Sequence, residues 1–283
     1  MVTVKFIRSD GKEFFIDNLT WKVTSDGLDG FDTVDNIITN EDKAIGDGSD
    51  FIAERIGNKD RTIKAVLVNR KLNNTMRELV RSFFVPKYQF ECHVSYNGIN
   101  KWCRGRLYSS PMPVKNIYDY LELEVTLLCD NPFLFSEDNF AKDIAGVIGK
   151  LEFDLEITES GVEFDSYEFA NEVEVNNDGD VETYCRAIIE ANGEVVNPKL
   201  ILGDYYIKLL DTLQDNDTLD IDLTVRPLIV KKNNENIIRL IDRTSNFDKI
   251  KFDVGKNMIG YGADSGDSNM SVTIYYNKRY IGL

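Results

Sequence analysis

The sequence is poor in the residues that most catalytic and metal sites need. It has one histidine, six prolines and four cysteines in 283 residues. Because His93 is alone, zinc sites with several imidazole ligands are excluded, and a Ser-His-Asp triad would have to include it. There is no C-x-x-C pair for a four-cysteine zinc site and no G-x-S-x-G nucleophile elbow. We therefore expect His93 to be a structural residue of a strand, and we expect no metal site.

Long apolar runs and a secretory pattern are also missing. No apolar stretch reaches the ~18 residues of a membrane-spanning helix. The N-terminus lacks the apolar region and the small-residue cleavage site of a signal peptide, so we expect none. The four cysteines lie in apolar, strand-like segments, and buried reduced thiols are expected rather than a disulfide framework. Of these, Cys92 and Cys103 could face each other across a hairpin.

Positive charge is scarce. The formal net charge is −15, which argues against nucleic acids and anionic membranes as partners, since both attract basic surfaces. Residues 1–150 carry 20 basic and 22 acidic residues, whereas residues 151–283 carry 13 and 26, so almost all of the excess lies in the second half. Residues 151–185 hold twelve acids and no base. We interpret them as the solvent face of alternating strands, with a surface for a partner as the alternative.

Cofactor motifs fail on spacing. The Gly-Lys pairs at 149–150 and 255–256 lack the glycine five residues upstream that a P-loop requires. The oxygen-rich stretches 215–222 and 264–269 could bind Ca²⁺, but turns and strand surfaces explain them equally well. Acidic pairs are abundant without any local signature of a glycosidase. We therefore expect no cofactor and no catalytic residue.

Alternation of apolar and polar residues predicts a mainly β protein, built as sandwiches or partly open barrels. The predicted strands are 2–7, 12–16, 62–68, 88–96, 101–108, 121–127, 150–157, 169–175, 219–225, 249–254 and 271–276. The turn signals between them lie at 9–11, 96–98, 176–180, 191–193 and 232–236.

One strong helix is predicted at 75–84. Thr75 and Glu78 have the spacing of a capping box, and Pro86 ends the helix. One stripe of apolar side chains is expected to pack on a sheet, and it comprises Met76, Leu79, Val80, Phe83 and Phe84.

Residues 24–60 resist assignment. They are rich in Gly, Asp and Asn, and a loop this long is usually functional. In an assembly protein, such a loop is often ordered by a neighbouring subunit. The composition changes again at 136–149, where we place a domain boundary.

The order of segments resembles the distal tail protein family of long-tailed bacteriophages and related prophage particles (siphophage-type tail components). The features that carry the resemblance run from MVTVKF at the N-terminus to SVTIYYNKRYIGL at the C-terminus. Between them lie AIGDGSD, DRTIKAVL, FFVPKYQF, WCRGRL, LELEVTLLCDNPFLF, VEVNNDGDVETYCRAII and DRTSNFDKIKFDVGKNMI. Two features depart from the family: Cys185 stands where the family often has Pro, and residues 151–172 are unusually acidic.

The resemblance implies two domains. Residues 1–135 would form a ring-forming domain like the tail-tube subunit, a β-sandwich or split barrel with one flanking α-helix. Residues 136–149 would be a linker, and 150–283 a galectin-like β-sandwich. The motif positions that the resemblance marks as structural are Gly46, Gly48, Arg61, Pro86, Asn131, Pro132, Phe133, Asn177, Gly179, Gly255 and Asn257.

The resemblance also implies a function without catalysis. Such proteins form a hexameric ring in the virion, at the tail tip or baseplate. The ring joins the tail tube protein to the hub or tail-associated protein, and it often carries receptor-binding proteins. We further hypothesise that residues 1–135 make the ring and residues 151–283 lie outside it.

Two rival functions belong to other classes. In a carbohydrate-binding module, exposed aromatic residues of the second domain would stack on a sugar. The available tyrosines are Tyr205, Tyr206, Tyr261, Tyr275, Tyr276 and Tyr280. A hydrolase is the less favoured rival, because the lone histidine and the missing nucleophile motif argue against it.

Overall fold

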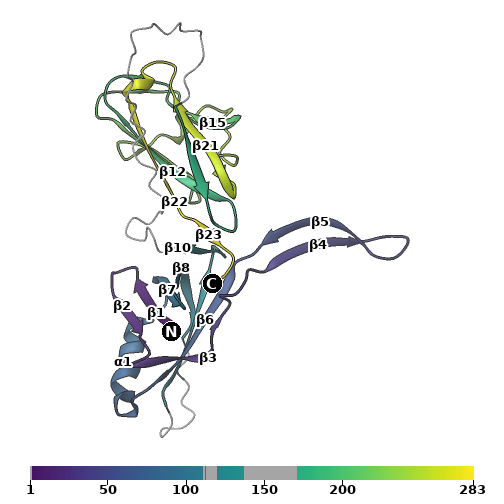
Figure 1. Ribbon diagram of the computed structural model, residues 1–283, viewed down its shortest axis with the longest axis vertical. Coiled ribbons are helices and arrows are strands. Elements are labelled where there is room, and N and C mark those ends of the chain that lie inside the picture. Colours follow the sequence, from purple (N-terminus) through teal and green to yellow (C-terminus); the bar gives the residue numbers. More distant parts are fainter. Residues whose placement is uncertain (1, 111, 113–119, 137–170) are drawn as a thin grey trace. The chain divides into compact units, whose positions relative to one another are not determined.

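The computed structural model describes residues 2–110, 112, 120–136 and 171–283 (Figure 1). The chain forms two compact units. The first unit comprises residues 1–137 together with 280–283, and the second unit comprises residues 138–279. Both are built mainly from β-strands, and the described residues contain one α-helix, so the predicted fold class is confirmed.

The C-terminus departs from the predicted domain boundaries. The sequence placed all of 150–283 in the second domain, whereas residues 280–283 cluster with the first unit. The backbone N–H of Leu283 donates to the carbonyl of Phe31 at 2.9 Å, which ties the last residue to the first unit. The predicted linker 136–149 lies outside the described residues except for Ser136.

The first unit rests on one sheet whose neighbouring strands run antiparallel. Its strands are β1 (Val2–Arg8), β2 (Glu13–Ile16), β3 (Trp21–Asp29), β6 (Lys59–Leu67), β7 (Gln89–Tyr96), β8 (Ile99–Ser109), β9 (Glu122–Cys129) and β10 (Leu134–Ser136). Their order is β2-β1-β7-β8-β9-β6-β3, and β10 pairs with β8 and with β23 (Arg279–Tyr280). Alternate residues along these strands are buried, so one face of the sheet forms the core.

The helix is present but starts earlier than predicted. A 3-10 turn, η1 (Arg70–Leu72), leads into α1 (Asn73–Phe83). The capping box is therefore wrong, since Thr75 lies inside the helix and Leu72 occupies the cap without a side-chain bond. A side-chain bond occurs instead at the preceding 3-10 turn, where Oδ1 of Asn69 accepts from the N–H of Lys71 at 3.1 Å.

The apolar stripe of α1 packs largely as predicted. Val80, Phe83 and Phe84 are buried, and Met76 packs at the edge of the core, whereas Leu79 is 43% exposed. The rings of Phe6, Phe14 and Phe90, from three strands of the sheet, lie 5.1–5.7 Å from that of Phe84. Such aromatic contacts stabilise the packing beyond the area they bury.

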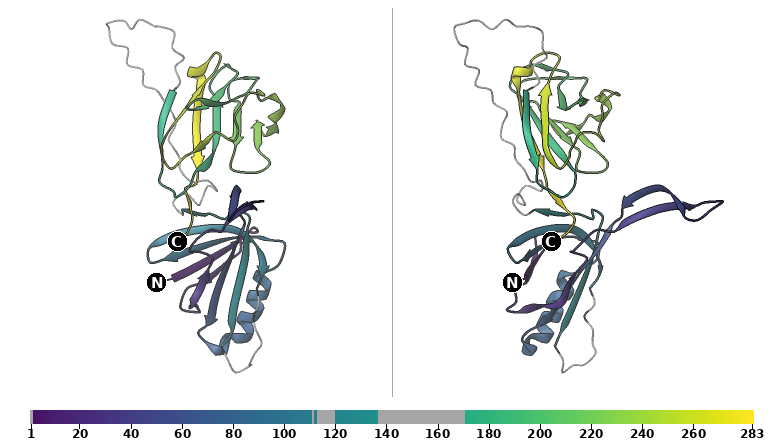
Figure 2. Two further views of the ribbon diagram at one scale, coloured as in Figure 1. Left: turned by 90° about the vertical axis from the view of Figure 1, so that its right-hand side faces the viewer. Right: turned by 45° about the vertical axis from the view of Figure 1, so that its right-hand side comes forward.

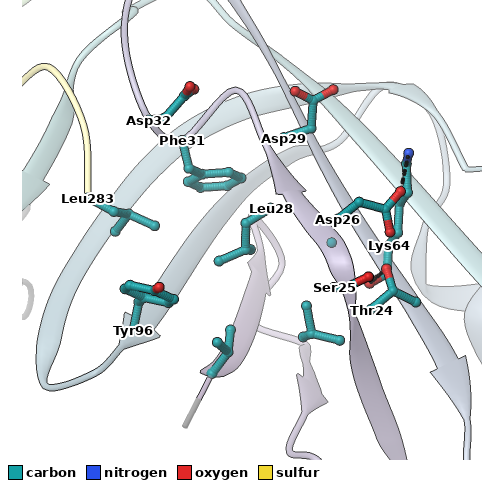
Figure 3. Close-up of a pocket in the computed structure, with 13 residues that line it drawn as sticks. Thr24, Ser25, Asp26, Leu28, Asp29, Phe31, Asp32, Lys64, Tyr96 and Leu283 are labelled. Atoms are coloured by element: carbon teal, nitrogen blue, oxygen red, sulfur yellow. Dashed lines mark hydrogen bonds and ion pairs between the residues drawn. The ribbon is translucent and has the colours of Figure 1, made fainter.

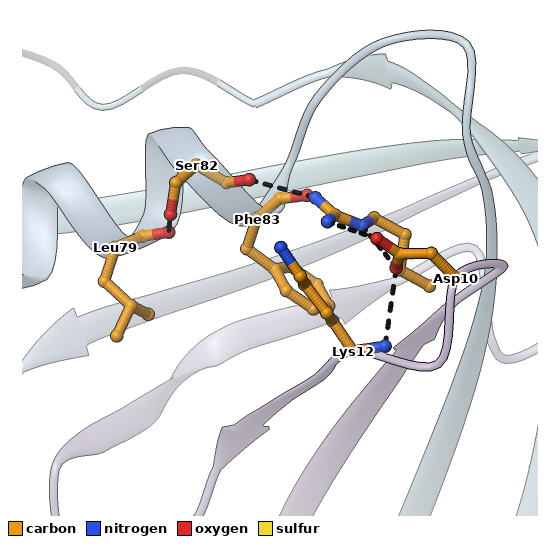
Figure 4. Close-up of polar contacts among 6 residues, drawn as sticks. Asp10, Lys12, Leu79, Ser82 and Phe83 are labelled. Carbon is orange, nitrogen blue, oxygen red and sulfur yellow. Dashed lines mark hydrogen bonds and ion pairs between the residues drawn. The ribbon is translucent and has the colours of Figure 1, made fainter.

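Arg8 joins the turn after β1 to the end of α1 (Figure 4). Its Nη1 donates to the carbonyls of Ser82 and Phe83 at 2.9 and 2.8 Å. Its Nε and Nη2 donate to the two carboxylate oxygens of Asp10 at 2.8 and 2.6 Å. A cation at these last helical carbonyls is favourable. The hydrogen bonds from Arg8 lower the pKa of Asp10 to about 2.

This pair predicts acid sensitivity of the first unit. Because the folded-state pKa of Asp10 is depressed, its contribution is present above the unfolded pKa of about 4 and is lost as pH falls toward 2. Urea unfolding between pH 6 and pH 2 would measure it by tryptophan fluorescence, since Trp21 and Trp102 both lie in the first unit. Asp10→Asn should lower stability at pH 6 and flatten the fall below pH 4, whereas Asp47→Asn, at an exposed tip, should do neither. An unchanged acid profile in Asp10→Asn would contradict the assignment.

Residues 24–60 are not a loop. After β3, the chain forms a hairpin of β4 (Asn36–Asp42) and β5 (Ser49–Ile56), which we call the arm. Of the strands that the structure describes, these two pair only with each other. Figures 1 and 2 show the arm extending away from the sheet of the first unit. Alternation did not reveal these strands, because every residue in both is exposed and neither face is buried.

The second unit is a β-sandwich. One sheet has the strand order β11-β21-β14-β15. The other sheet has the order β19-β18-β17-β12-β20, and its sixth strand, β22, pairs with β12. The first sheet comprises β11 (Asn171–Asn177), β14 (Lys199–Leu202), β15 (Tyr205–Lys208) and β21 (Gly255–Gly262). The second comprises β12 (Thr183–Ala191), β17 (Thr218–Asp222), β18 (Ile229–Lys232), β19 (Glu235–Asn236), β20 (Lys251–Phe252) and β22 (Met270–Tyr276). Apolar residues of both sheets share one core.

Short elements complete the second unit. They are the strand pair β13 (Val195–Val196) and β16 (Thr212–Leu213), and the 3-10 turns η3 (Ile238–Leu240) and η4 (Asp267–Asn269). The predicted strand 249–254 is reduced to β20, and the predicted strand 150–157 lies outside the described residues. Along β11 exposed and buried residues alternate, with Glu172 and Glu174 exposed. That part of the acidic segment is the solvent face of a strand, as interpreted.

Candidate functional site

The arm is the most unusual surface of the first unit. It exposes six large apolar side chains: Ile37 42%, Ile38 56%, Ile45 94%, Phe51 63%, Ile52 54% and Ile56 40%. Ile38, Phe51 and Ile56 share one face, because they pair with Glu54, Asn40 and Asn36, and facing partners lie on the same side. An extra residue on β5 between the pairs Thr39–Ala53 and Asn40–Phe51 bends the ribbon there.

The tip of the arm is a glycine turn. Gly46 and Gly48, two predicted motif residues, have φ values of +97° and +91°, which disfavour any residue with a Cβ. Four acids and one lysine surround them: Glu41, Asp42, Asp47, Asp50 and Lys43. Among the described residues Lys43 pairs only with Asp50, at 3.8 Å, so the tip keeps a negative charge.

The root of the arm is held by a buried cation. Arg61, on β6 just after the arm, is fully buried. Its Nη2 donates to the carbonyl of Pro132 at 2.6 Å, and its guanidinium lies 5.5 Å from the ring centroid of Phe31, just before the arm. Asn131 supports the same loop, since its Oδ1 accepts from the N–H of Phe133 at 3.1 Å. Four predicted motif residues therefore meet at one place.

A cavity of about 540 Å³ lies beside this root (Figure 3). Leu28, Phe31, Tyr96 and Leu283 line its apolar part. Three aspartates add charge to its rim, and one of them, Asp26, pairs with Lys64 at 3.2 Å. Within the described part of the chain, no group of three or more His, Cys, Asp or Glu side chains is arranged to hold a metal ion.

The remaining motif residues lie apart from the arm. In the second unit Asn177 is fully buried, and its Nδ2 donates to the carbonyls of Val181 and Phe252 at 3.0 and 3.2 Å. Its Oδ1 accepts from the N–H of Gly179 at 3.0 Å. A Cβ on Gly179 would lie 2.7 Å from the carbonyl oxygen of Arg279, so no larger residue fits there.

Gly255 and Asn257 form a second turn on the same sheet. Gly255 pairs with Asn177 and has a φ of +95°. The amide of Asn257 bonds the backbone N–H and carbonyl of Asp253 at 2.9 and 2.8 Å. The last of the motif residues, Pro86, lies in the turn that follows α1. These residues close turns and strand ends, and they face no common cavity.

His93 and the cysteines behave as structural residues. His93 is buried on β7 with its ring stacked on Trp102, 6.0 Å between centroids. All four thiols are free and buried, and Cys92 faces Cys103 across β7–β8. Burial raises the pKa of Cys185 to about 12, which removes the thiolate that a nucleophile needs.

The six tyrosines do not form one binding face. Tyr261 and Tyr276 are buried, and Tyr280 belongs to the first unit. The hydroxyl of Tyr206 shares a hydrogen bond with that of Thr244 at 2.7 Å. Tyr205, 43% exposed, is the one well-exposed ring of the set. No helix among the described residues is long and apolar enough to cross a bilayer.

Comparisons with known proteins find one family match and several structures with a similar fold. Residues 178–280 match the family described as siphovirus-type tail component, C-terminal domain. No curated protein matches the chain. The crystal structure of the SPP1 Dit protein, described as a paradigm of the hub adsorption apparatus in phages infecting Gram-positive bacteria, is similar over 98% of both chains, with 10% identity and a TM-score of 0.68.

The phage P2 baseplate is a second similar structure. In its activated conformation with Ca, it matches over 98% of both chains, with 10% identity and a TM-score of 0.51. At these identities the likeness concerns the fold. Together with the family match, it confirms the resemblance to phage distal tail proteins that the order of sequence motifs indicated.

Removing the side chain of Asn177 should destabilise the second unit. Asn177→Ala leaves the buried carbonyl of Phe252, the buried N–H of Gly179 and the half-buried carbonyl of Val181 without this partner, at about 1–3 kcal/mol for each unsatisfied buried group. Asn176→Ala, next to it and exposed, should change the free energy of unfolding by less than about 0.5 kcal/mol. Urea unfolding by far-UV circular dichroism measures both, with tryptophan fluorescence marking the first unit. Equal effects would contradict a structural role for Asn177.

Proposed function

We propose that this protein is a structural component of the tail tip or baseplate of a phage or phage-like particle. In this proposal it forms a hexameric ring that joins the distal end of the tail tube to the hub or tail-associated protein and offers sites for receptor-binding proteins. The likeness to the SPP1 Dit protein along 98% of the chain carries the proposal. The family match of the second unit supports it independently.

The arm supports the ring. A two-stranded ribbon is marginal in water, and exposed apolar side chains in such a cluster are typical of an interface. In a ring, each subunit uses one surface to bind its neighbour and a different surface to be bound. The arm supplies the first of these surfaces, and Ile38, Phe51 and Ile56 provide its apolar face.

The charge distribution supports the assignment of the two units. Residues 1–150 are nearly neutral, whereas residues 151–283 hold twice as many acids as bases. Six strongly acidic domains packed side by side would repel one another. We therefore assign the ring contacts to the first unit and place the second unit outside the ring.

No catalytic function is part of the proposal. The one histidine is buried beside Trp102, and the four thiols are buried. A carbohydrate site would need exposed rings grouped together, and the six candidate tyrosines are dispersed.

Light scattering and negative-stain imaging of the full chain, expressed with its tube and hub partners, test this function. The wild type should give rings with a central hole. Ile38→Asp combined with Phe51→Asp should fold but lose the ring, because two charges replace the apolar face of the arm. Leu19→Asp, also at an exposed apolar residue but outside the arm, should keep it. A wild-type chain that stays monomeric with both partners present would overturn the proposal.

A further inference from the structure

In this acidic protein, one segment of the first unit is strongly basic. Residues 70–87, which contain α1, hold five Lys and Arg and one acid. Lys71, Arg81 and Lys87 are exposed, and no described carboxylate forms an ion pair with them. Arg77 is half-buried and donates to the carbonyl of Met112 at 3.3 Å, which leaves its charge uncompensated by any described acid. We call this surface the basic helix.

The basic helix also carries exposed apolar groups. Leu79 is 43% exposed, but it lies two residues from both Arg77 and Arg81 on α1 and so projects from the other side of the helix. Tyr88, one residue after Lys87, is 37% exposed. Near Lys87 the surface therefore combines positive charge with an exposed ring, which suits a partner that is negative and apolar at the same time.

The tip of the arm has that composition. Its four acids and one lysine surround Ile45, which is 94% exposed. The acids of the tip thus match the bases of the other surface in sign. Such complementarity both steers association and disfavours wrong partners.

The two surfaces lie on opposite flanks of the first unit. In Figures 1 and 2 the arm extends away from α1, so the tip does not reach the helix of its own chain. From Asn36 to Asp42 the first strand of the arm spans about 20 Å, at about 3.4 Å per residue. That reach and the opposite placement suit a head-to-tail contact between copies.

We propose that the tip of the arm, residues 41–50, docks on the basic helix of a second copy of this chain. This inference rests on the proposed ring and names the place where the arm lands. Glu41, Asp42, Asp47 and Asp50 would face Lys71, Arg81 and Lys87. Each surface carries an excess of one charge in the single chain, and the contact balances the two.

Charge reversal on each surface tests the contact in the full chain with its tube and hub partners. Lys71→Glu with Arg81→Glu should raise the dissociation constant of the ring about tenfold or more, because several modest ion pairs become repulsive. Asp42→Lys with Asp47→Lys should do the same. The four substitutions together should restore the ring, since the signs then match again.

Controls separate charge from folding. Arg239→Glu with Arg243→Glu makes the same change in net charge on exposed residues of the second unit and should leave the ring unchanged. Tryptophan fluorescence reports whether the first unit folds. If the variant in α1 does not fold, Lys71→Glu with Lys87→Glu reverses two charges outside the helix.

The outcomes distinguish this contact from the ring itself. Rescue by the combined variant, with wild-type rings that weaken as salt rises above about 0.1 M, supports the contact. If both reversal variants form rings as stable as those of the wild type, the contact is overturned and the proposed function still stands. A DNA fragment that binds the wild-type chain but not the variant Lys71→Glu with Arg81→Glu, while the ring of that variant stays intact, assigns the basic helix to nucleic acid and overturns the contact. Wild-type chains without rings overturn both.

Discussion

The shape of the first unit depends on the contacts that the buried guanidinium of Arg61 makes. It joins three segments that are far apart in the sequence: β6, the loop of Pro132, and Phe31 before the arm. The backbone carbonyl of Phe31 in turn accepts a hydrogen bond from the N–H of Leu283, so the C-terminus is tied to the same point. Burying a cation is costly unless its hydrogen bonds and packing compensate. In this protein the cation is buried at the place where the arm leaves the sheet.

The root of the arm is held on both of its strands. Lys59, two residues before Arg61, pairs with Asp35 at 3.0 Å, so both ends of the arm are held at its base. Beyond that base the arm has no core of its own, and its apolar face and acidic tip are in solvent. The free energy that ordering the arm costs is recovered when another surface covers it. The arm is thus a ribbon that projects from a rigid domain, which suits the contact between subunits that we propose.

The sequence predicted the parts of the fold that are buried on one face. In β6, β9 and β17 alternate side chains enter a core, and alternation located each of them to within a few residues, whereas β12 alternates as well but was not predicted. The arm was missed because both of its faces are exposed, so burial left no period to detect. The start of α1 was misplaced because a 3-10 turn precedes it, and local spacing favoured Thr75 as a cap. The return of residues 280–283 to the first unit is a tertiary pairing that no local pattern encodes.

The candidate site was only partly predictable. Arg61, Asn131, Pro132 and Phe133 were singled out by resemblance, and their meeting at the arm's root emerged only from the fold. The charges of α1 and of the tip were visible in the sequence, but their placement on opposite flanks was not. Hydrogen–deuterium exchange of residues 36–56, in the free chain and in the assembled tail tip, measures directly whether assembly covers the arm. We predict rapid exchange in the free arm and strong protection on assembly. Equal exchange in the two states would contradict a role of the arm in assembly.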